Sequence, residues 1–121
     1  MADRLDEVQV RLRAFVAERE WAQFHDPKNL SMAVASEAGE LLAEFRWVAS
    51  EAADAWAREP ENQRRVALEA ADVGISLLLL CDRIGVDLLD AMNAKIQVNE
   101  RNYPVSEATG RHSRRRVDPS H

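Results

Sequence analysis

The strongest constraint on the fold is a long helical pattern between Pro60 and Gly85. Proline suits the first turn of a helix, and glycine is the usual residue just after its last turn. We therefore expect a helix from about Glu61 to Ile84, in which the run from Ile75 to Cys81 is apolar almost all round and should be buried. Residues with small or apolar side chains recur along it at helical spacing, at Val66, Ala70, Val73, Leu77, Leu80 and Ile84.

Capping residues and apolar spacing predict three more helices. Asp3 and Asp87 are suitable N-caps, and Pro104 ends the last pattern. The polar stretch Ala49–Gln63 should be a loop with one short helical turn around Trp56. The expected helices run from Asp3 to Arg19, from Asn29 or Leu30 to Val48, from Glu61 to Ile84 and from Asp87 to Pro104.

These elements predict an all-α fold, a four-helix bundle that forms one domain over residues 1–105. Four glycines and four prolines in 121 residues leave long segments free for helix, and no stretch shows a β pattern. From Ser106 the chain is polar and basic without periodicity, so residues 106–121 should be a disordered basic tail.

Composition and charge narrow the classes of partner. The net charge of -5 makes nucleic acid an unlikely partner, because nucleic-acid binding uses clustered positive charge. The N-terminal residues have mixed charge and no apolar stretch, so we expect no signal peptide. The longest apolar run is far shorter than the roughly 18 residues that span a bilayer. We therefore expect a cytoplasmic protein that does not enter a membrane.

Two acidic pairs interrupt the apolar patterns. Glu37-Ala-Gly-Glu40 and Glu69-Ala-Ala-Asp72 each set two carboxylates three residues apart, which places both on one face of a helix. Glu37 also lies on the apolar stripe of its own helix. Antiparallel packing of the two helices would gather four carboxylates, and their repulsion and lost hydration would require a cation between them. Such pairs are otherwise common on solvated helix faces, so both interpretations stay open on spacing alone.

The metal, if present, should be a hard divalent ion. Di-iron bundles need Glu-x-x-His pairs, and none of the histidines His25, His112 and His121 lies three residues after a glutamate. A site made of oxygen ligands favours Mg²⁺ or Mn²⁺, and these ions commonly complete their shell with phosphate oxygens. The pattern therefore indicates a phosphate compound as substrate.

Two further groups of residues are candidates for binding that substrate. Lys95 and Asn99 share a face of the last helix, with Arg101 and Tyr103 within the next turn, and cationic side chains bind phosphate oxygens. On spacing alone, a solvated surface charge is the more common role for a lysine such as Lys95. Trp21 and His25 lie beside a turn and form the second group. Instead of binding substrate, Trp21 could cover the end of the bundle, and His25 could be a capping or surface histidine.

Taken together, these residues resemble the all-α nucleoside triphosphate pyrophosphohydrolases, the MazG-like family, and within it the dCTP pyrophosphatase branch is the most similar. The resemblance spans about Phe15 to Pro104. Its motifs are Phe15–His25, Pro27–Leu30, Glu37–Glu40, Phe45–Trp47, Glu69–Val73, Val86–Leu88 and Lys95 with Asn99–Pro104.

The resemblance implies an enzyme that hydrolyses a nucleoside triphosphate to the monophosphate and pyrophosphate. It implies that the four carboxylates Glu37, Glu40, Glu69 and Asp72 hold Mg²⁺ against the triphosphate and that one of them, or the metal, activates the attacking water. Lys95 and Asn99 would contact phosphate, while Trp21 and Trp47 would enclose the base. It also implies a homodimer or homotetramer, which agrees with apolar residues spread too widely for one small chain to cover.

One departure concerns the choice of substrate. Ser76 stands four residues after Asp72, where many relatives of the dCTP branch carry a tyrosine, so Ser76 is a further candidate for substrate contact. We expect house-cleaning of the nucleotide pool, with dCTP or a modified dCTP preferred. The alternative is a non-catalytic helical module that binds nucleotides or docks a protein.

Overall fold

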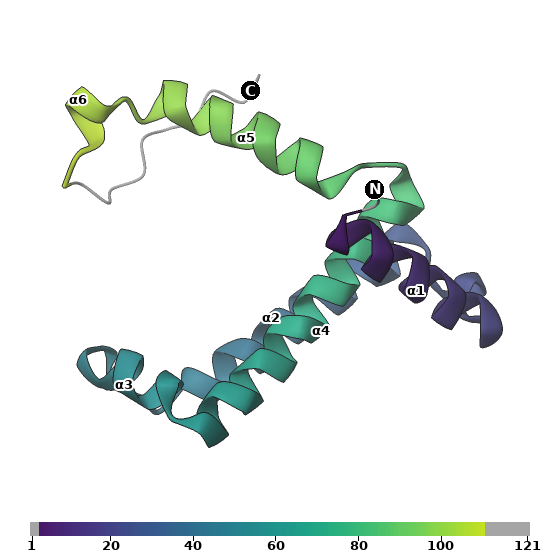
Figure 1. Ribbon diagram of the computed structural model, residues 1–121, viewed down its shortest axis with the longest axis horizontal. Coiled ribbons are helices and arrows are strands. Elements are labelled where there is room, and N and C mark those ends of the chain that lie inside the picture. Colours follow the sequence, from purple (N-terminus) through teal and green to yellow (C-terminus); the bar gives the residue numbers. More distant parts are fainter. Residues whose placement is uncertain (1–2, 111–121) are drawn as a thin grey trace. The chain divides into compact units, whose positions relative to one another are not determined.

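The computed structural model describes residues 3–110, and every regular element in this range is helical (Figure 1). Four α-helices have fifteen residues or more, and shorter ones connect or follow them. The all-α expectation is therefore confirmed. The elements are α1 (Arg4–Glu18), the 3₁₀ helix η1 (Trp21–Phe24), α2 (Pro27–Phe45), the 3₁₀ helix η2 (Ser50–Ala52), α3 (Ala53–Arg58), α4 (Pro60–Ile84), α5 (Leu88–Asn102) and α6 (Val105–Ala108).

Local capping explains the starts of α1, α2 and α5 and the end of α4. Asp3 accepts a hydrogen bond from the backbone N–H of Asp6, and Asp87 accepts one from that of Asp90, as expected for N-caps. Gly85 ends α4 in the left-handed region at φ 74°, where a residue without Cβ is favoured. The expected bounds of α1, α4 and α5 are confirmed to within one or two residues.

The second helix differs from the expectation at both ends. It begins at Pro27 rather than at Asn29 or Leu30, because Asp26 accepts a hydrogen bond from Asn29 N–H and Pro27 occupies the first helical turn. It ends at Phe45, before the expected Val48. The connection to α4 holds two short helices, η2 and α3, where one helical turn around Trp56 was expected.

A short helix, α6, lies where the sequence predicted the start of a disordered tail at Ser106. The carbonyl of Pro104 accepts the backbone N–H groups of Glu107 and Ala108, and the Thr109 hydroxyl donates to the carbonyl of Val105. These local bonds close one turn without apolar periodicity, so the prediction was wrong for this turn. The rest of the predicted tail, from Arg111, lies outside the described residues.

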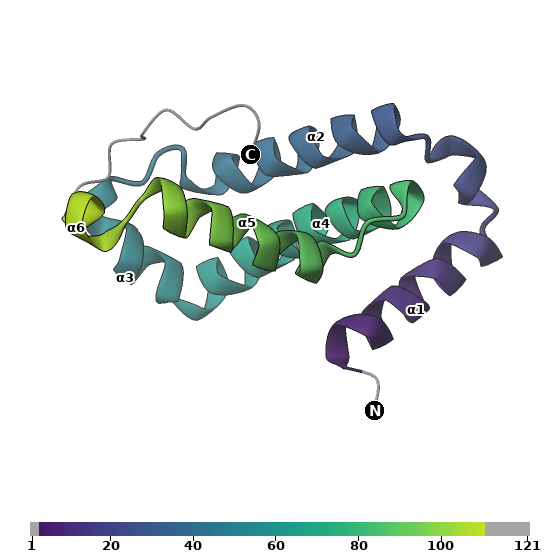
Figure 2. The ribbon, with the colours of Figure 1, turned by 90° about the horizontal axis from the view of Figure 1, so that it is seen from above.

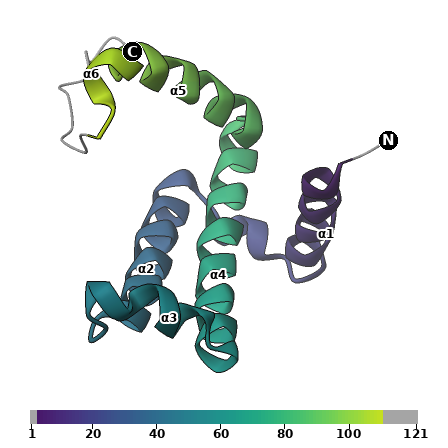
Figure 3. The same cartoon turned by 60° about the vertical axis from the view of Figure 1, so that its left-hand side comes forward.

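The chain divides into two compact units, Met1–Gly85 and Val86–His121. In the first unit, α2 and α4 run side by side and antiparallel, joined through α3 (Figure 3). η1 leads the chain from α1 into α2 (Figure 2). The second unit contains α5 and α6. A single four-helix domain over residues 1–105 therefore stays a prediction, since α5 belongs to the second unit.

The core of the described residues is thin. Its buried side chains are Val16, Leu30, Ser76, Leu78 and Cys81, and none of the large side chains between residues 3 and 110 is fully buried. The burial expected for Ile75–Cys81 is confirmed in part, because Ile75 is 40% exposed. None of the helices in residues 3–110 has both the length and the apolar character needed to cross a membrane.

Candidate functional site

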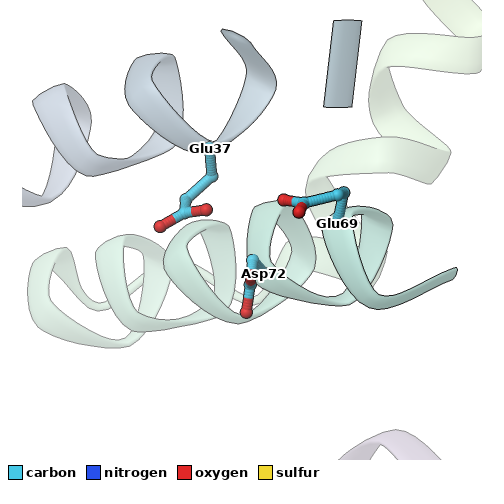
Figure 4. A group of neighbouring side chains, drawn as sticks. All are labelled: Glu37, Glu69 and Asp72. Carbon is cyan, nitrogen blue, oxygen red and sulfur yellow. The ribbon is translucent and has the colours of Figure 1, made fainter. Parts of the chain in front are cut away.

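The facing sides of α2 and α4 bring three carboxylates together. Glu37 reaches from α2 toward Glu69 and Asp72 on α4 (Figure 4), and one oxygen of each lies within 4.8 Å of the other two. Glu37 and Glu69 are half-buried, whereas Asp72 is exposed. We call these three residues the acidic cluster.

Local sequence explains how these side chains meet. Leu30, the most buried residue of α2, lies two helical turns before Glu37 and so shares its face. The face that carries Glu37 is therefore the face packed toward α4. Glu69 and Asp72 are three residues apart within α4, one turn from each other. Antiparallel packing of the two helices places Glu37 level with Glu69 and Asp72, which is part of the arrangement that the sequence predicted.

The electrostatics of the acidic cluster disfavour a third negative charge. Partial burial raises the pKa of the Glu69 carboxyl above its ordinary value, and the charge of Asp72 raises it further. The charges of Glu40, Glu44 and Glu37 add smaller contributions in the same direction. A cation placed among these groups would reverse the effect, since it would stabilise every carboxylate around it.

Glu40 stands at the edge of this arrangement. It is exposed, and its carboxylate is not among the oxygens that lie within 4.8 Å of one another. Its charge nevertheless raises the pKa of Glu69. The structure therefore brings three of the four predicted carboxylates together and leaves the fourth nearby.

Sequence reasoning missed Glu44, which lies one turn beyond Glu40 on α2. Its side chain is only 18% exposed and accepts hydrogen bonds from Nε and Nη2 of Arg65 on α4, at 3.2 and 2.8 Å. Arg65 thus neutralises this carboxylate, and the pair ties α2 to α4 beside the acidic cluster. The spacing of Glu37, Glu40 and Glu44 on one helix face was the signal that could have found it.

The acidic cluster fits a hard divalent cation. Its donors are all carboxylate oxygens, which Mg²⁺ and Mn²⁺ prefer. Two oxygens that bind one Mg²⁺ at about 2.1 Å can be no more than about 4.2 Å apart. A separation of up to 4.8 Å therefore requires only a small rotation of the side chains. Glu40, one turn away on α2, could supply a further oxygen.

The aromatic residues expected near the base lie at the end of α1 and in η1. Trp21 contacts the Phe15 ring edge to face, with the centroids 5.6 Å apart, and is partly exposed. His25, the C-cap of η1, lines a cavity with Arg13, Asp82 and Arg83, and this cavity includes none of the four predicted carboxylates. His25 and the predicted carboxylates therefore do not share this cavity.

Trp47 and Ser76 occupy contrasting positions. Trp47 follows the end of α2 and is 88% exposed, with the Arg46 guanidinium 5.5 Å from its ring centroid. Ser76 is buried within α4, one turn beyond Asp72. An exposed indole is available for stacking on a base, whereas a buried hydroxyl can act only on groups that enter the helix packing.

The phosphate-binding candidates belong to the second unit. Lys95 and Asn99 lie one turn apart on α5 and are exposed, as is Arg101. Tyr103 is the C-cap of α5, and its backbone N–H donates to the carbonyl of Asn99. The shared helix face of Lys95 and Asn99 is confirmed, while their role toward phosphate stays a prediction.

Comparison with known proteins finds a matching family model and similar proteins that are described as MazG-like or as pyrophosphatases. A family model described as MazG-like matches residues 32–115. The chain is 41% identical over 101 residues to dCTP pyrophosphatase 1 of Bos taurus, across 83% of this chain and 60% of the relative. It is 40% identical over 96 residues to dCTP pyrophosphatase 1 of Homo sapiens, across 78% of this chain and 56% of the relative. The chain thus spans 60% or less of the length of these two curated relatives.

A solved structure extends the similarity to the fold. The crystal structure of a pyrophosphatase from Archaeoglobus fulgidus matches with a TM-score of 0.80 and 36% identity. The match covers 86% of this chain and 95% of the archaeal chain.

Proposed function

The chain belongs to the MazG-like family, and on this premise we propose that it is a metal-dependent nucleotide pyrophosphohydrolase. It would convert a nucleoside triphosphate and water into the monophosphate and pyrophosphate. The observation that carries the proposal is the convergence of Glu37, Glu69 and Asp72 from two helices. The similarity to mammalian dCTP pyrophosphatases and to an archaeal pyrophosphatase supports it.

Glu37, Glu40, Glu69 and Asp72 would hold the metal, which we propose to be Mg²⁺, with Mn²⁺ as the other suitable ion. When bound, such an ion neutralises triphosphate charge and lowers the pKa of a water molecule. Glu37 or Glu40 would then accept the proton of the attacking water, since a carboxylate acts as a general base when it lies within hydrogen-bond reach.

The remaining candidates would bind the two ends of the nucleotide. Lys95 and Asn99 on α5 would contact phosphate oxygens, with Arg101 and Tyr103 as further contributors. Trp21 and Trp47 would stack on the base. His25 and Ser76 complete the set of proposed substrate contacts.

We further propose dCTP or a modified dCTP as the preferred substrate, with house-cleaning of the nucleotide pool in the cytoplasm as the role. The names of the mammalian relatives support the base and sugar. Indole rings stack on any base, so selectivity for one base must come from contacts to the edge of that base.

A screen for pyrophosphate release tests the proposal. Pure, folded protein is incubated with Mg²⁺ and each common (d)NTP, together with 5-methyl-dCTP as a modified substrate. We expect release from at least one nucleotide, strongest with a cytosine deoxynucleotide, and loss of release with a chelator. If none of these nucleotides yields pyrophosphate, the proposal is wrong.

The alternative is a non-catalytic module that binds nucleotides or docks a protein. Calorimetry separates the two functions, because a metal-bridged triphosphate site binds nucleotide more tightly when Mg²⁺ is present. A module that uses only its aromatic residues would bind with the same affinity in Mg²⁺ and in chelator. To prevent turnover, the titration uses a non-hydrolysable dCTP analogue.

A further inference from the structure

Two polar links join the N-terminal segment to the C-terminal part of α4. Nη1 of Arg83 donates to the backbone carbonyl of Ala22 in η1, at 3.2 Å. Nε and Nη2 of Arg13 on α1 donate to Oδ1 of Asp82, at 3.0 and 2.7 Å. Asp82 and Arg83 are neighbours on α4, so both links act at one place.

Apolar packing at this place is incomplete. A cavity of about 190 Å³ lies there, and its lining includes Arg13, Val16, His25, Leu79, Asp82 and Arg83. The side chains that line this open cavity lack protein neighbours on that side, so they make fewer dispersion contacts than in a packed core. Close packing therefore contributes little to holding η1 against α4, and the two polar links matter more.

The backbone that enters η1 also needs external support. Glu20 adopts a left-handed conformation at φ 53°, which a residue with a Cβ seldom adopts. Such conformations persist where surrounding contacts hold them in place. The Ala22 carbonyl that Arg83 binds lies two residues beyond Glu20 and also accepts the backbone N–H of His25.

We propose that Asp82 and Arg83 are positioning residues that hold η1 so that Trp21 and His25 are presented to the nucleotide. Arg83 acts through the carbonyl of Ala22, and Asp82 acts through Arg13. This role rests on the proposed function, because Trp21 and His25 contact a nucleotide only if the protein is the proposed enzyme. It concerns residues outside the acidic cluster and outside the phosphate-binding set.

The expected signature is a change in nucleotide binding without a change in chemistry. Without the link, η1 samples more conformations, and binding must then remove that freedom. The cavity beneath η1 is lined by none of the four carboxylates, so the metal chemistry should continue. The Arg13–Asp82 pair is exposed, and exposed pairs stabilise a fold weakly, so the effect should be local rather than global.

The first measurement is steady-state kinetics of Arg83→Ala with dCTP and Mg²⁺, or with the best nucleotide of the screen. We expect KM to rise by roughly fivefold or more and kcat to stay within about twofold, which is the pattern of lost uniform binding. Arg83→Lys retains a donor for the Ala22 carbonyl and should restore most of the affinity. Asp82→Asn should show a smaller rise in KM, because it weakens only the link through Arg13.

Arg64→Ala is the matched control, since Arg64 is an exposed arginine of the same helix that makes no ion pair within residues 3–110. Its KM should equal that of the wild type. An active wild type whose Arg83→Ala variant keeps the wild-type KM, or loses kcat alone, overturns the positioning role. A lysine variant no better than the alanine variant also overturns it.

Amide hydrogen exchange provides a readout that does not depend on activity. In Arg83→Ala, the amides from Ala22 to His25 should exchange faster, while those in the middle of α4 stay unchanged. Unchanged exchange over Ala22–His25 overturns the proposal. A wild type that releases no pyrophosphate rejects the proposed function instead, and the exchange experiment then still decides whether Arg83 holds η1.

Discussion

At the scale of single residues, Glu69 is the carboxylate within residues 3–110 whose surroundings most oppose its negative charge. It is half-buried on α4, and four other carboxylates influence its pKa. Partial desolvation raises that pKa, and Asp72 raises it further. In the absence of a cation, the folded protein is therefore destabilised by this repulsion at neutral pH, and a bound cation would relieve it.

The repulsion around Glu69 predicts that a substitution that removes its charge stabilises the protein. Between the ordinary glutamate pKa and the raised pKa of Glu69, the folded state binds more protons than the unfolded state, so stability falls as pH rises. In chelator at pH 7 to 8, Glu69→Gln should have a higher Tm than the wild type, and the difference should vanish near pH 4. Thermal unfolding followed by circular dichroism measures both.

Glu100→Gln is the control, because it removes an exposed charge on α5 and should leave Tm nearly unchanged. Added Mg²⁺ should raise the Tm of the wild type more than that of Glu69→Gln. If the variant is less stable than the wild type at every pH in chelator, Glu69 carries no charge strain.

A second prediction at this scale concerns turnover. Asp72→Asn and Glu40→Gln each remove a proposed metal ligand and should lower pyrophosphate release by roughly 100-fold or more, with helix content retained. Glu51→Gln, an exposed site in η2, should keep wild-type activity. A variant of Asp72 or Glu40 that works at the wild-type rate would remove that residue from the mechanism.

At the scale of elements, α4 organises the described part of the chain. It supplies two residues of the acidic cluster, the partner of Glu44 and the two residues that hold η1. Its two ends follow directly from Pro60 and Gly85, which is why sequence reasoning placed it to within one residue. α6, by contrast, is a single turn formed by bonds among neighbours, and one turn carries no periodic signal.

The backbone of α4 yields a pair of opposite predictions. Gly85 has φ 74°, so Gly85→Ala should lower the free energy of unfolding by about 1–2 kcal/mol. Gly74 lies inside the helix, and a Cβ added there meets nothing within 4 Å, so Gly74→Ala should raise it by about 0.5–1 kcal/mol. Urea unfolding measures both. Equal effects of the two substitutions would contradict the assigned backbone conformation.

At the scale of the whole molecule, much apolar surface of residues 3–110 is exposed to solvent. Met92 and Ile96 on α5, Leu42 on α2 and Leu68 on α4 are all exposed. No large side chain within residues 3–110 is fully buried, whereas a stable chain of this size normally has such a core. Burial against further copies of the chain would supply the missing apolar contacts.

We therefore predict that the protein is at least a dimer, with a tetramer as the larger alternative. Sedimentation velocity at micromolar concentration should give a mass of two or four chains. Because association stabilises the folded state by mass action, Tm should rise with protein concentration. A folded, active monomer with a concentration-independent Tm would show that the exposed apolar residues have another purpose.

The sequence by itself determined the all-α class, the long helices with their caps, and the two acidic pairs. These features depend on residues within a few positions of one another, so local rules are sufficient to read them. The early start of α2 at Pro27 was also encoded locally, in Asp26 and Pro27, and should have been recognised.

Only the tertiary structure decided which of these residues meet. Glu37 meets Glu69 and Asp72 because α2 and α4 pack antiparallel at one register, and the same register pairs Glu44 with Arg65. Glu40, equally prominent in the sequence, remains outside the acidic cluster, and Arg83 reaches Ala22 across 61 positions. Register and long-range contact arise from the packing of whole helix faces, so no short stretch of sequence encodes them.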